Sequence, residues 1–169
     1  NILEDYDLAS LDPNSVARLH LETEASRMAY AARDRYVADQ RQEDVPVDHM
    51  LSAEFAAELR AQISPDRAVE APEATGPAYR DTIYLSVVDK DRNACSFINS
   101  LYMPFGTGLT APRSGVVLQN RAAGFRVEPG HPNNVAPRNR PLHTIIPGMC
   151  MKDGKVAYSY GVMGGGYQP

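Results

Sequence analysis

The residue best placed to do chemistry is Thr82, which opens a strand-like run directly after a proline-rich segment. The run Thr82–Val88 is rich in β-branched and aromatic side chains, a composition typical of a strand. Residues 64–80 carry three prolines and one glycine, which predicts an exposed, mobile linker. A threonine freed by cleavage of its own preceding peptide bond has a hydroxyl nucleophile and an α-amine that titrates near neutral pH. The alternative is an ordinary strand threonine, since Thr is favoured in strands.

No pattern in the sequence points to a metal or cofactor site. The four histidines lie far apart and show no ligand spacing. Cys95 and Cys150 are isolated, and each is predicted to be a small buried hydrophobe on a strand. The triplet at 164–166 lacks the spacing of a phosphate-binding glycine loop, and there is no Gly-x-Ser-x-Gly elbow. We therefore expect neither a metal nor a cofactor.

The element that must hold Thr82 is a predicted hairpin. Residues 82–88 and 94–100 have strand composition and flank the polar turn 89–93. Further strands are predicted at 115–119, 144–151 and 156–161. Asp153-Gly154 between the last two suits a tight hairpin turn, and four prolines make 126–141 a loop.

The first half of the chain has the periodicity of helices. Asp12 followed by Pro13 predicts a helix start, and apolar residues then recur every three or four positions to about Asp39. A shorter helix is predicted to start at Ser52, and another short one around residues 2–9. Helices followed by antiparallel strands indicate an α+β fold with layered packing.

Composition and charge exclude several classes of protein. A chain of 169 residues that is 43% hydrophobic and 22% charged is not intrinsically disordered. It has no apolar run that would span a membrane, and two cysteines cannot form a disulfide scaffold. Net charge is −4, with an acidic first half (residues 1–78, net −9) and a basic second half (79–169, net +5). No basic cluster is dense enough for a nucleic-acid groove. The missing initiator Met and the Gly-rich end lead us to expect a segment of a longer chain.

Several further motifs, in matching order and spacing, give the sequence a family resemblance. The stretch Asp81–Asp91 resembles the start of the small subunit of gamma-glutamyltranspeptidases, and Glu22–Arg35 is similar to the last long helix of their large subunit. The other matching stretches are Phe105–Gly108, Ser114–Asn120, Asn139–Leu142 and Gly161–Gly165. The resemblance therefore covers nearly the whole chain.

This resemblance implies a fold and a processing step. The fold would be part of the four-layer αββα sandwich of N-terminal-nucleophile hydrolases. Residues 1–81 would be the C-terminal helical part of the large-subunit region plus a linker, and 82–169 the strand-rich start of the small-subunit region. Autocleavage would occur at the Asp81–Thr82 bond. The partners would be the remainder of both subunits.

The resemblance also assigns catalytic roles residue by residue. Thr82 matches the nucleophile, and Ser100 stands where the family has a threonine whose hydroxyl helps to activate it. Gly164 and Gly165 match glycines that donate backbone N–H groups to the oxyanion. Such donors typically contribute about 2.7–4 kcal/mol to transition-state stabilisation. Without the resemblance, the glycines would be interpreted as a loop or bulge.

The substrate pocket departs from the family pattern. Tyr102 replaces an Asn that contacts the glutamyl group, and Arg121 and Gly124 replace the Gln and Asp that hold the α-amine. His143 and Thr144 replace two consecutive serines that bind the α-carboxylate. Arg121 would repel a glutamyl ammonium and suit an acyl group that ends in a carboxylate without an amine, such as a glutaryl chain. This pattern looks like the transpeptidase-like branch and the cephalosporin acylases. The alternative for Arg121 is a surface or ion-paired arginine.

The sequence therefore leads to two hypotheses for the function. The first is a self-processing amidohydrolase or acyltransferase that acts on gamma-glutamyl or glutaryl-type amides, with water as the expected acceptor. The second is a catalytically inert family scaffold or excised fragment. We expect a small-molecule amide substrate, no nucleic-acid or membrane partner, and homo-oligomers favoured by open sheet edges. The physiological substrate and the cellular location stay open.

Overall fold

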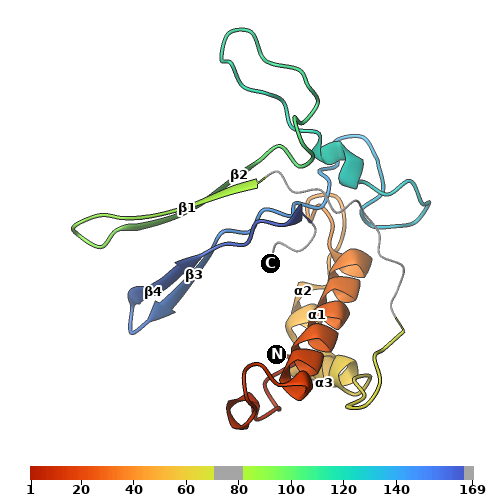
Figure 1. Ribbon diagram of the computed structural model, residues 1–169. Helices are drawn as coiled ribbons and strands as arrows, with labels where there is room; N and C mark the ends of the chain where they lie inside the picture. Colours follow the sequence, from red (N-terminus) through yellow and green to blue (C-terminus); the bar gives the residue numbers. More distant parts are fainter. Residues whose placement is uncertain (71–81, 166–169) are drawn as a thin grey trace. The chain divides into compact units, whose positions relative to one another are not determined.

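The computed structural model describes residues 1–70 and 82–165, which fall into two compact units. The described part of the first unit comprises residues 1–70 and 127–134 and contains the helices of the N-terminal half (Figure 1). The described part of the second comprises residues 82–126 and 135–165 and contains two hairpins. The predicted division at residue 81 stays a prediction. No helix in the described ranges is both long and apolar enough to cross a membrane.

The first unit is built on the 21-residue helix α1, Val16–Tyr36. Its N-cap is Ser15, whose hydroxyl accepts the backbone N–H of Arg18 at 3.2 Å. The predicted cap at Asp12 was wrong: this carboxylate instead accepts the N–H of Asn14 at 2.8 Å, in a turn that precedes the helix. The helix also ends three residues before Asp39, with the Val37 N–H bonded to the Arg33 carbonyl.

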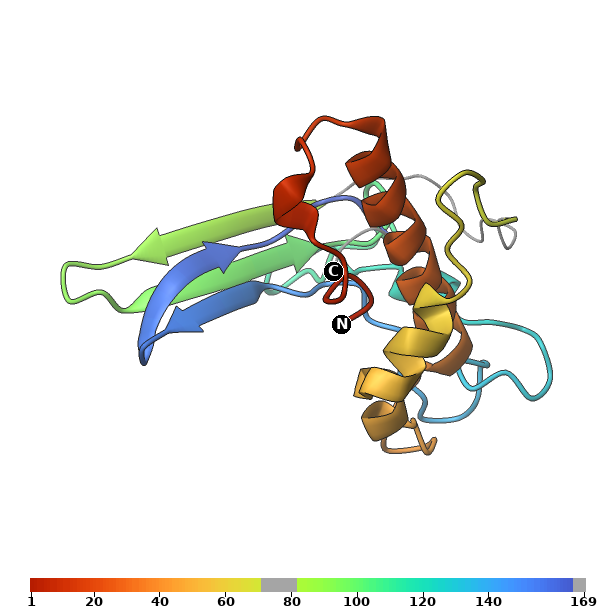
Figure 2. The same ribbon diagram turned by 90° about the horizontal axis from the view of Figure 1, so that it is seen from below.

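Two short helices pack against α1. Helix α3, Ala53–Arg60, begins after Ser52 as predicted, and the Ser52 hydroxyl accepts the Phe55 N–H at 3.1 Å. Helix α2, Val47–Leu51, was not predicted, and the expected helix at 2–9 is only a 3₁₀ turn, Leu8–Ser10. Figure 2 shows α1 and α3 side by side. Their contact forms the small apolar core of this unit, made of Ala25, Met28, Phe55 and Ala56.

The start of the predicted linker belongs to the first unit. His20, Glu24 and Arg27 of α1 bond to the backbone of Ser64 and Val69. Ser64 and Val69 are thus tied to α1, whereas residues 65–68 between them are exposed, as predicted. The mobility of this segment stays a prediction. Residues 71–80 of the predicted linker lie outside the described residues.

The second unit begins with the predicted hairpin. Strand β1, Thr82–Val88, pairs antiparallel with β2, Ala94–Ser100, in the register that sets Thr82 opposite Ser100. The Asp89 carboxylate accepts the backbone N–H groups of Asp91 and Asn93, which closes the turn. Both strand ranges are confirmed.

The second hairpin also forms around the predicted turn. Strand β3, Gly148–Lys152, pairs antiparallel with β4, Lys155–Tyr160, and both turn residues, Asp153 and Gly154, have positive φ. The predicted strand 144–151 thus begins only at Gly148. The predicted strand 115–119 is wrong: this region has a single bridge, between Thr110 and Val117. The loop at 126–141 contains no helix or strand, as predicted.

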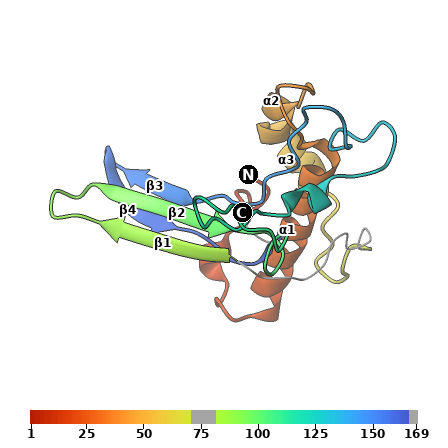
Figure 3. The same ribbon diagram turned by 90° about the horizontal axis from the view of Figure 1, so that it is seen from above.

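The two hairpins contact each other through β1, β2 and β4 (Figure 3). The Tyr84 hydroxyl meets Ser96 Oγ at 3.1 Å and Ser159 Oγ at 3.0 Å, and Ser96 Oγ donates to the Tyr160 carbonyl. Ile98, opposite Tyr84, is the one buried apolar residue of the described part of this unit. The described residues are therefore a mixed α+β structure with one hairpin laid against the other.

The other face of the β1–β2 hairpin is apolar and exposed. Ile83, Leu85, Val87 and Phe97 are each between 48% and 63% exposed. Cys95 stands on the same face, opposite Val87, and Cys150 on β3 is exposed as well. The prediction that both cysteines are buried was wrong, because the strands that carry them have a face that nothing in the described residues covers.

Candidate active site

Thr82 and Ser100 meet at the end of the β1–β2 hairpin. Antiparallel pairing sets the first residue of β1 opposite the last residue of β2, and directly opposed side chains share one face of the sheet. The Thr82 hydroxyl donates to Ser100 Oγ at 3.1 Å. Both side chains are half-buried. This hydrogen bond orients the Thr82 hydroxyl, whereas activation of a hydroxyl nucleophile also requires a base that takes its proton.

Ser100 also holds the residue two positions further on. The backbone N–H of Tyr102 donates to Ser100 Oγ at 3.0 Å. Tyr102 has a φ of 80°, in the left-handed region that non-glycine residues rarely adopt. Strained backbone of this kind persists where surrounding contacts impose it, and here it directs the tyrosine ring toward Arg121.

Arg121 is a buried cation at the start of the 3₁₀ turn Arg121–Gly124. Its side chain is only 3% exposed, its guanidinium lies 5.0 Å from the centroid of the Tyr102 ring, and Nη1 donates to Thr144 Oγ1 at 2.8 Å. Its Nη2 is buried and has no hydrogen-bond partner among the described residues. Burial lowers the pKa of Arg121, although arginine stays protonated under all ordinary conditions. A buried guanidinium with a spare donor favours an anionic ligand that bonds to it.

Thr144 and His143 are carried by the segment that leads into β3. Thr144 receives the Arg121 hydrogen bond, whereas His143 is exposed and its Nδ1 accepts the Ile145 N–H at 3.3 Å. Partial desolvation and the positive charge of Arg121 lower the pKa of His143. The imidazole is therefore neutral at pH 7 and adds no second positive charge beside Arg121.

Gly124 leaves room for the Tyr102 side chain. A Cβ added at Gly124 would stand 3.4 Å from the Tyr102 hydroxyl, at the lower limit of ordinary van der Waals contact. The two positions that were predicted to depart from the family pattern are therefore neighbours in space, because the Tyr102 hydroxyl lies beside a residue that has no side chain.

The two predicted oxyanion glycines follow β4. Gly161 stands so close to the Tyr84 and Ile98 side chains that an added Cβ would lie 2.5 Å from the tyrosine ring. Gly164 and Gly165 come three and four residues later, half-buried, and Gly165 has a φ of 60° that suits glycine. Their oxyanion role stays a prediction, as does cleavage at Asp81, which lies outside the described residues.

The structure therefore brings together six of the predicted site residues in one run of contacts. They are Thr82, Ser100, Tyr102, Arg121, Gly124 and Thr144. Sequence reasoning did not single out Asn120, whose Oδ1 accepts the Met103 N–H and whose Nδ2 donates to the Gly106 carbonyl. This amide fixes the chain after Tyr102 to the residue before Arg121. The available signal was the pair of amide residues, Gln119 and Asn120, that follows the apolar residues 116–118.

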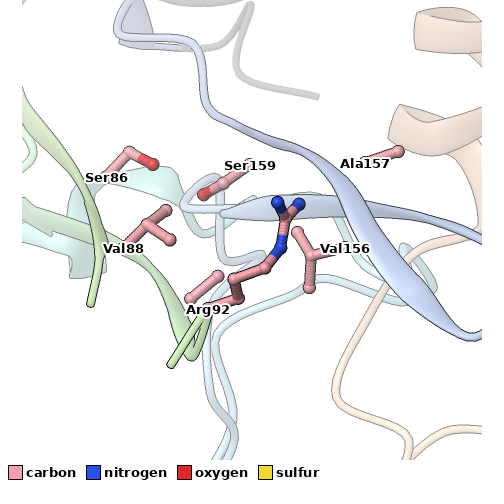
Figure 4. A pocket seen from close by; sticks show the side chains of 7 residues that line it. Ser86, Val88, Arg92, Val156, Ala157 and Ser159 are labelled. Carbon is pink, nitrogen blue, oxygen red and sulfur yellow. The ribbon is translucent and has the colours of Figure 1, made fainter. Parts of the chain in front are cut away.

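A separate cavity of about 180 Å³ lies at the other end of the β1–β2 hairpin. Ser86, Val88 and Arg92 line it from one hairpin, and Val156, Ala157 and Ser159 from the other (Figure 4). Val88 is six residues from Thr82 along β1, so this cavity is not the candidate active site. Across residues 1–70 and 82–165, no group of three His, Cys, Asp or Glu side chains could hold a metal ion.

Comparison with known proteins gives consistent matches over the whole chain. The family model described as gamma-glutamyltranspeptidase matches residues 1–169. The chain is 37% identical to a glutathione hydrolase-like YwrD proenzyme of Bacillus subtilis, over all of this chain and 32% of the relative. It is 38% identical to an oxamate amidohydrolase proenzyme of Klebsiella pneumoniae, over 96% of this chain and 30% of that one.

A solved structure matches as well. The crystal structure of cephalosporin acylase from Bacillus halodurans superimposes with a TM-score of 0.81 at 35% identity. The match covers 95% of this chain and 30% of the acylase chain. The chain thus spans about a third of the length of the relatives that it matches.

Proposed function

The chain belongs to the gamma-glutamyltranspeptidase family, and from this we propose that it is the nucleophile-bearing part of a self-processing amidohydrolase. Its relatives are named as hydrolases, amidohydrolases and acylases, which are enzymes that cleave amides. The observation that carries the proposal is the 3.1 Å hydrogen bond from the Thr82 hydroxyl to Ser100 Oγ. It supports a nucleophile at the start of β1.

Self-processing would free the α-amine of Thr82. The Thr82 hydroxyl adds to the Asp81 carbonyl carbon, and the peptide nitrogen leaves as an amine while an ester forms. Water then cleaves the ester, so that Asp81 ends in a carboxylate and Thr82 regains its hydroxyl. The new amine is correctly placed on the same residue to accept the hydroxyl proton in later turnovers.

Each turnover would then pass through an acyl-enzyme. The Thr82 oxygen attacks the substrate amide as its proton moves to the α-amine, and the leaving amine takes that proton. Backbone N–H groups of Gly164 and Gly165 would stabilise the oxyanion, and water would hydrolyse the ester. Ser100 would hold the Thr82 hydroxyl in position throughout.

The preferred acyl group would end in a carboxylate without an amine. The spare Nη2 donor of Arg121 supports an anionic group in the pocket, and the Tyr102 ring and Thr144 hydroxyl hold the guanidinium in place. Arg121 and Gly124 offer no negative charge to hold a glutamyl ammonium. A glutaryl amide would therefore be a better substrate than the matching gamma-glutamyl amide.

We also propose the architecture around this site. The β1–β2 and β3–β4 hairpins would contribute to the two sheets of a four-layer αββα sandwich, supported by their mutual contacts and by the uncovered apolar face of β1–β2. The remainder of the large and small subunits would complete both sheets, and the assembled protein or the chain would form homo-oligomers.

The test of the nucleophile is mass spectrometry of the full-length protein. Wild type is expected to yield a chain that begins at Thr82, and Thr82→Ala is expected to stay intact. Ser86→Ala is the matched control, because Ser86 is a hydroxyl residue on the same strand and the same face. If wild type never yields a chain that starts at Thr82, the proposal is wrong.

The second candidate is a family scaffold without activity. The changed pocket residues Tyr102, Arg121 and Gly124 favour it, because they remove the groups that hold a glutamyl substrate. A panel of gamma-glutamyl and glutaryl anilides on the processed full-length protein separates the two functions. Turnover of the glutaryl compound supports the hydrolase, and no turnover of any member supports the scaffold. We expect the 169-residue chain alone to be inactive, and measurable hydrolysis by it would contradict this.

A further inference from the structure

Three side chains of α1 that no proposed catalytic step uses bond to the backbone of the segment after α3. His20, Glu24 and Arg27 are spaced four and three residues apart, which places them on one face of the helix. His20 Nε2–H donates to the Ser64 carbonyl at 2.7 Å. Glu24 Oε2 accepts the Val69 N–H at 2.7 Å, and Arg27 Nη2 donates to the Val69 carbonyl.

The Glu24–Arg27 pair is itself closed and buried. Arg27 Nη1 donates to Glu24 Oε1 at 2.5 Å, so the carboxylate bonds to both the arginine and the Val69 peptide. Glu24 is 1% exposed, the most deeply buried side chain in the described residues. The Val69 N–H, followed by Arg27, lowers the pKa of Glu24, so the carboxylate is charged at neutral pH. A buried carboxylate is costly without such partners, which means that Val69 and Glu24 hold each other in place.

We infer that Glu24 and Arg27 form a backbone clamp that fixes the chain at Val69, ahead of the Asp81–Thr82 bond. Both ends of the clamp bond to main-chain groups of Val69, its N–H and its carbonyl, so the side chain at this position is not what is recognised. Glu24 and Arg27 are then positioning residues for self-processing. That last role rests on the proposed function, whereas the clamp itself does not.

The clamp determines how much chain separates a fixed point from the scissile bond. When the clamp holds Val69, the fixed point lies 12 residues before Asp81. When the clamp is lost and only the His20 contact at Ser64 remains, the nearest fixed point lies 17 residues before Asp81. Closure entropy grows slowly with tether length, so this lengthening slows processing by only about twofold. Because the clamp lies upstream of the cut, it would also keep the new chain end attached to α1 after cleavage.

Because the expected effect on processing is small, the clamp is tested by the rate of amide hydrogen exchange at Val69. Hydrogen–deuterium exchange is measured by mass spectrometry on full-length protein carrying Thr82→Ala, which keeps the precursor uniform. Glu24→Gln sets an amide NH₂ against the Arg27 guanidinium and removes the charge, so exchange at Val69 is expected to accelerate by about tenfold or more. Glu22→Gln is the matched control, since Glu22 pairs with Arg18 on the same helix. Its exchange at Val69 is expected to equal that of the parent.

Unchanged exchange at Val69 in Glu24→Gln, or an unprotected Val69 amide in the parent, would overturn the clamp. Peptides from α1 in the same data report whether the helix is intact. If the α1 peptides lose their protection in Glu24→Gln, Arg27→Lys is the milder variant. In this variant an ammonium group replaces the guanidinium that bonds to both Glu24 and Val69. That variant is expected to accelerate exchange at Val69 and to leave α1 protected; unchanged exchange there overturns the clamp.

The positioning role is tested separately with Thr82 intact. The rate at which a chain beginning at Thr82 appears is expected to fall about twofold in Glu24→Gln and to stay unchanged in Glu22→Gln. Equal rates in the two variants would overturn the positioning role. If wild type is never processed, the proposed function is wrong while the exchange result still decides the clamp.

Discussion

A single residue, Tyr102, joins the two halves of the candidate site. Its backbone N–H bonds to Ser100, which receives the Thr82 hydroxyl, and its ring lies against Arg121. Displacement of this tyrosine would therefore disturb both the proposed nucleophile, Thr82, and the Arg121 cation. Tyr102 makes its contacts with Ser100 and Arg121 from a backbone conformation with positive φ, which is unfavourable for a residue other than glycine.

At this scale, removal of the Ser100 hydroxyl should slow the chemical step. In the full-length enzyme, Ser100→Ala is expected to lower kcat on a glutaryl anilide by about a hundredfold. This is the lower end of the usual range for a side chain that takes part in a proton transfer. Ser100→Thr keeps a hydroxyl at this position and is expected to retain most of the activity. Initial rates at saturating substrate check both, and equal kcat values for Ser100→Ala and wild type would contradict the role of Ser100.

Substitution of Arg121 should affect binding more than chemistry. Arg121→Gln is expected to raise KM for a glutaryl anilide by about 10- to 150-fold, the effect of losing a hydrogen bond to a charged group. KM for a neutral acyl anilide of the same length should change little. Arg113→Gln, an exposed arginine in a neighbouring loop, is the control. An equal rise in KM for charged and neutral substrates would show that Arg121 only supports the fold.

At the scale of elements, the contact between the hairpins depends on a residue without a side chain. Gly161, directly after β4, lies against the Tyr84 and Ile98 side chains, which cross from the β1–β2 hairpin. Because Ile98 is buried and Tyr84 is tied to Ser96 and Ser159, neither can withdraw freely. The close approach of the two hairpins is therefore only compatible with glycine at this position.

Gly161→Ala is expected to lower the free energy of unfolding by about 1–3 kcal/mol, the usual cost of overpacking. Chemical denaturation of the full-length protein measures it. Val162→Ala, at the next and more exposed position, is the control and should change stability by less than about 0.5 kcal/mol. If Gly161→Ala unfolds at the same denaturant concentration as wild type, the added methyl group does not destabilise the contact between the hairpins, and the prediction is wrong.

At the scale of the whole molecule, the apolar face of the β1–β2 hairpin that carries Ile83, Leu85 and Val87 is exposed among the described residues. Leu85 and Phe97 stand opposite each other on it, 51% and 48% exposed, with Ile83 and Val87 on either side of Leu85. Apolar faces of this kind on soluble chains are covered by other elements or by other chains. In the proposed full-length protein, the remainder of the two subunits would supply this cover.

The 169-residue chain alone is therefore expected to self-associate, as measured by light scattering across a dilution series. Leu85→Lys combined with Phe97→Lys should shift it toward monomer, because two charges then lie at the centre of the face. Val16→Lys, an exposed apolar residue of α1 in the first unit, is the control and should leave association unchanged. A clean monomer for the unmodified chain would contradict the prediction.

The sequence by itself determined the features that depend on neighbours within a few positions. The β1–β2 hairpin follows from strand composition and the Asp89 turn, and its register then places Thr82 opposite Ser100. The Ser52 cap and the Asp153-Gly154 turn are similarly local. Family resemblance supplied the roles of these residues, and the matches over the whole chain confirm the family.

Only the tertiary structure decided what depends on residues far apart in the chain. The burial of Arg121 against Tyr102 and Thr144, the exposure of Cys95 and the clamp of Val69 by Glu24 all required distant segments to be placed together. Local patterns carry no information on which face of a strand is covered or which buried charge finds a partner. Burial and hydrogen-bond partners are properties of the packed chain. They tie Ser64 and Val69 to α1, and they show that Arg121, predicted to bind the acyl group, is a buried cation with a spare donor.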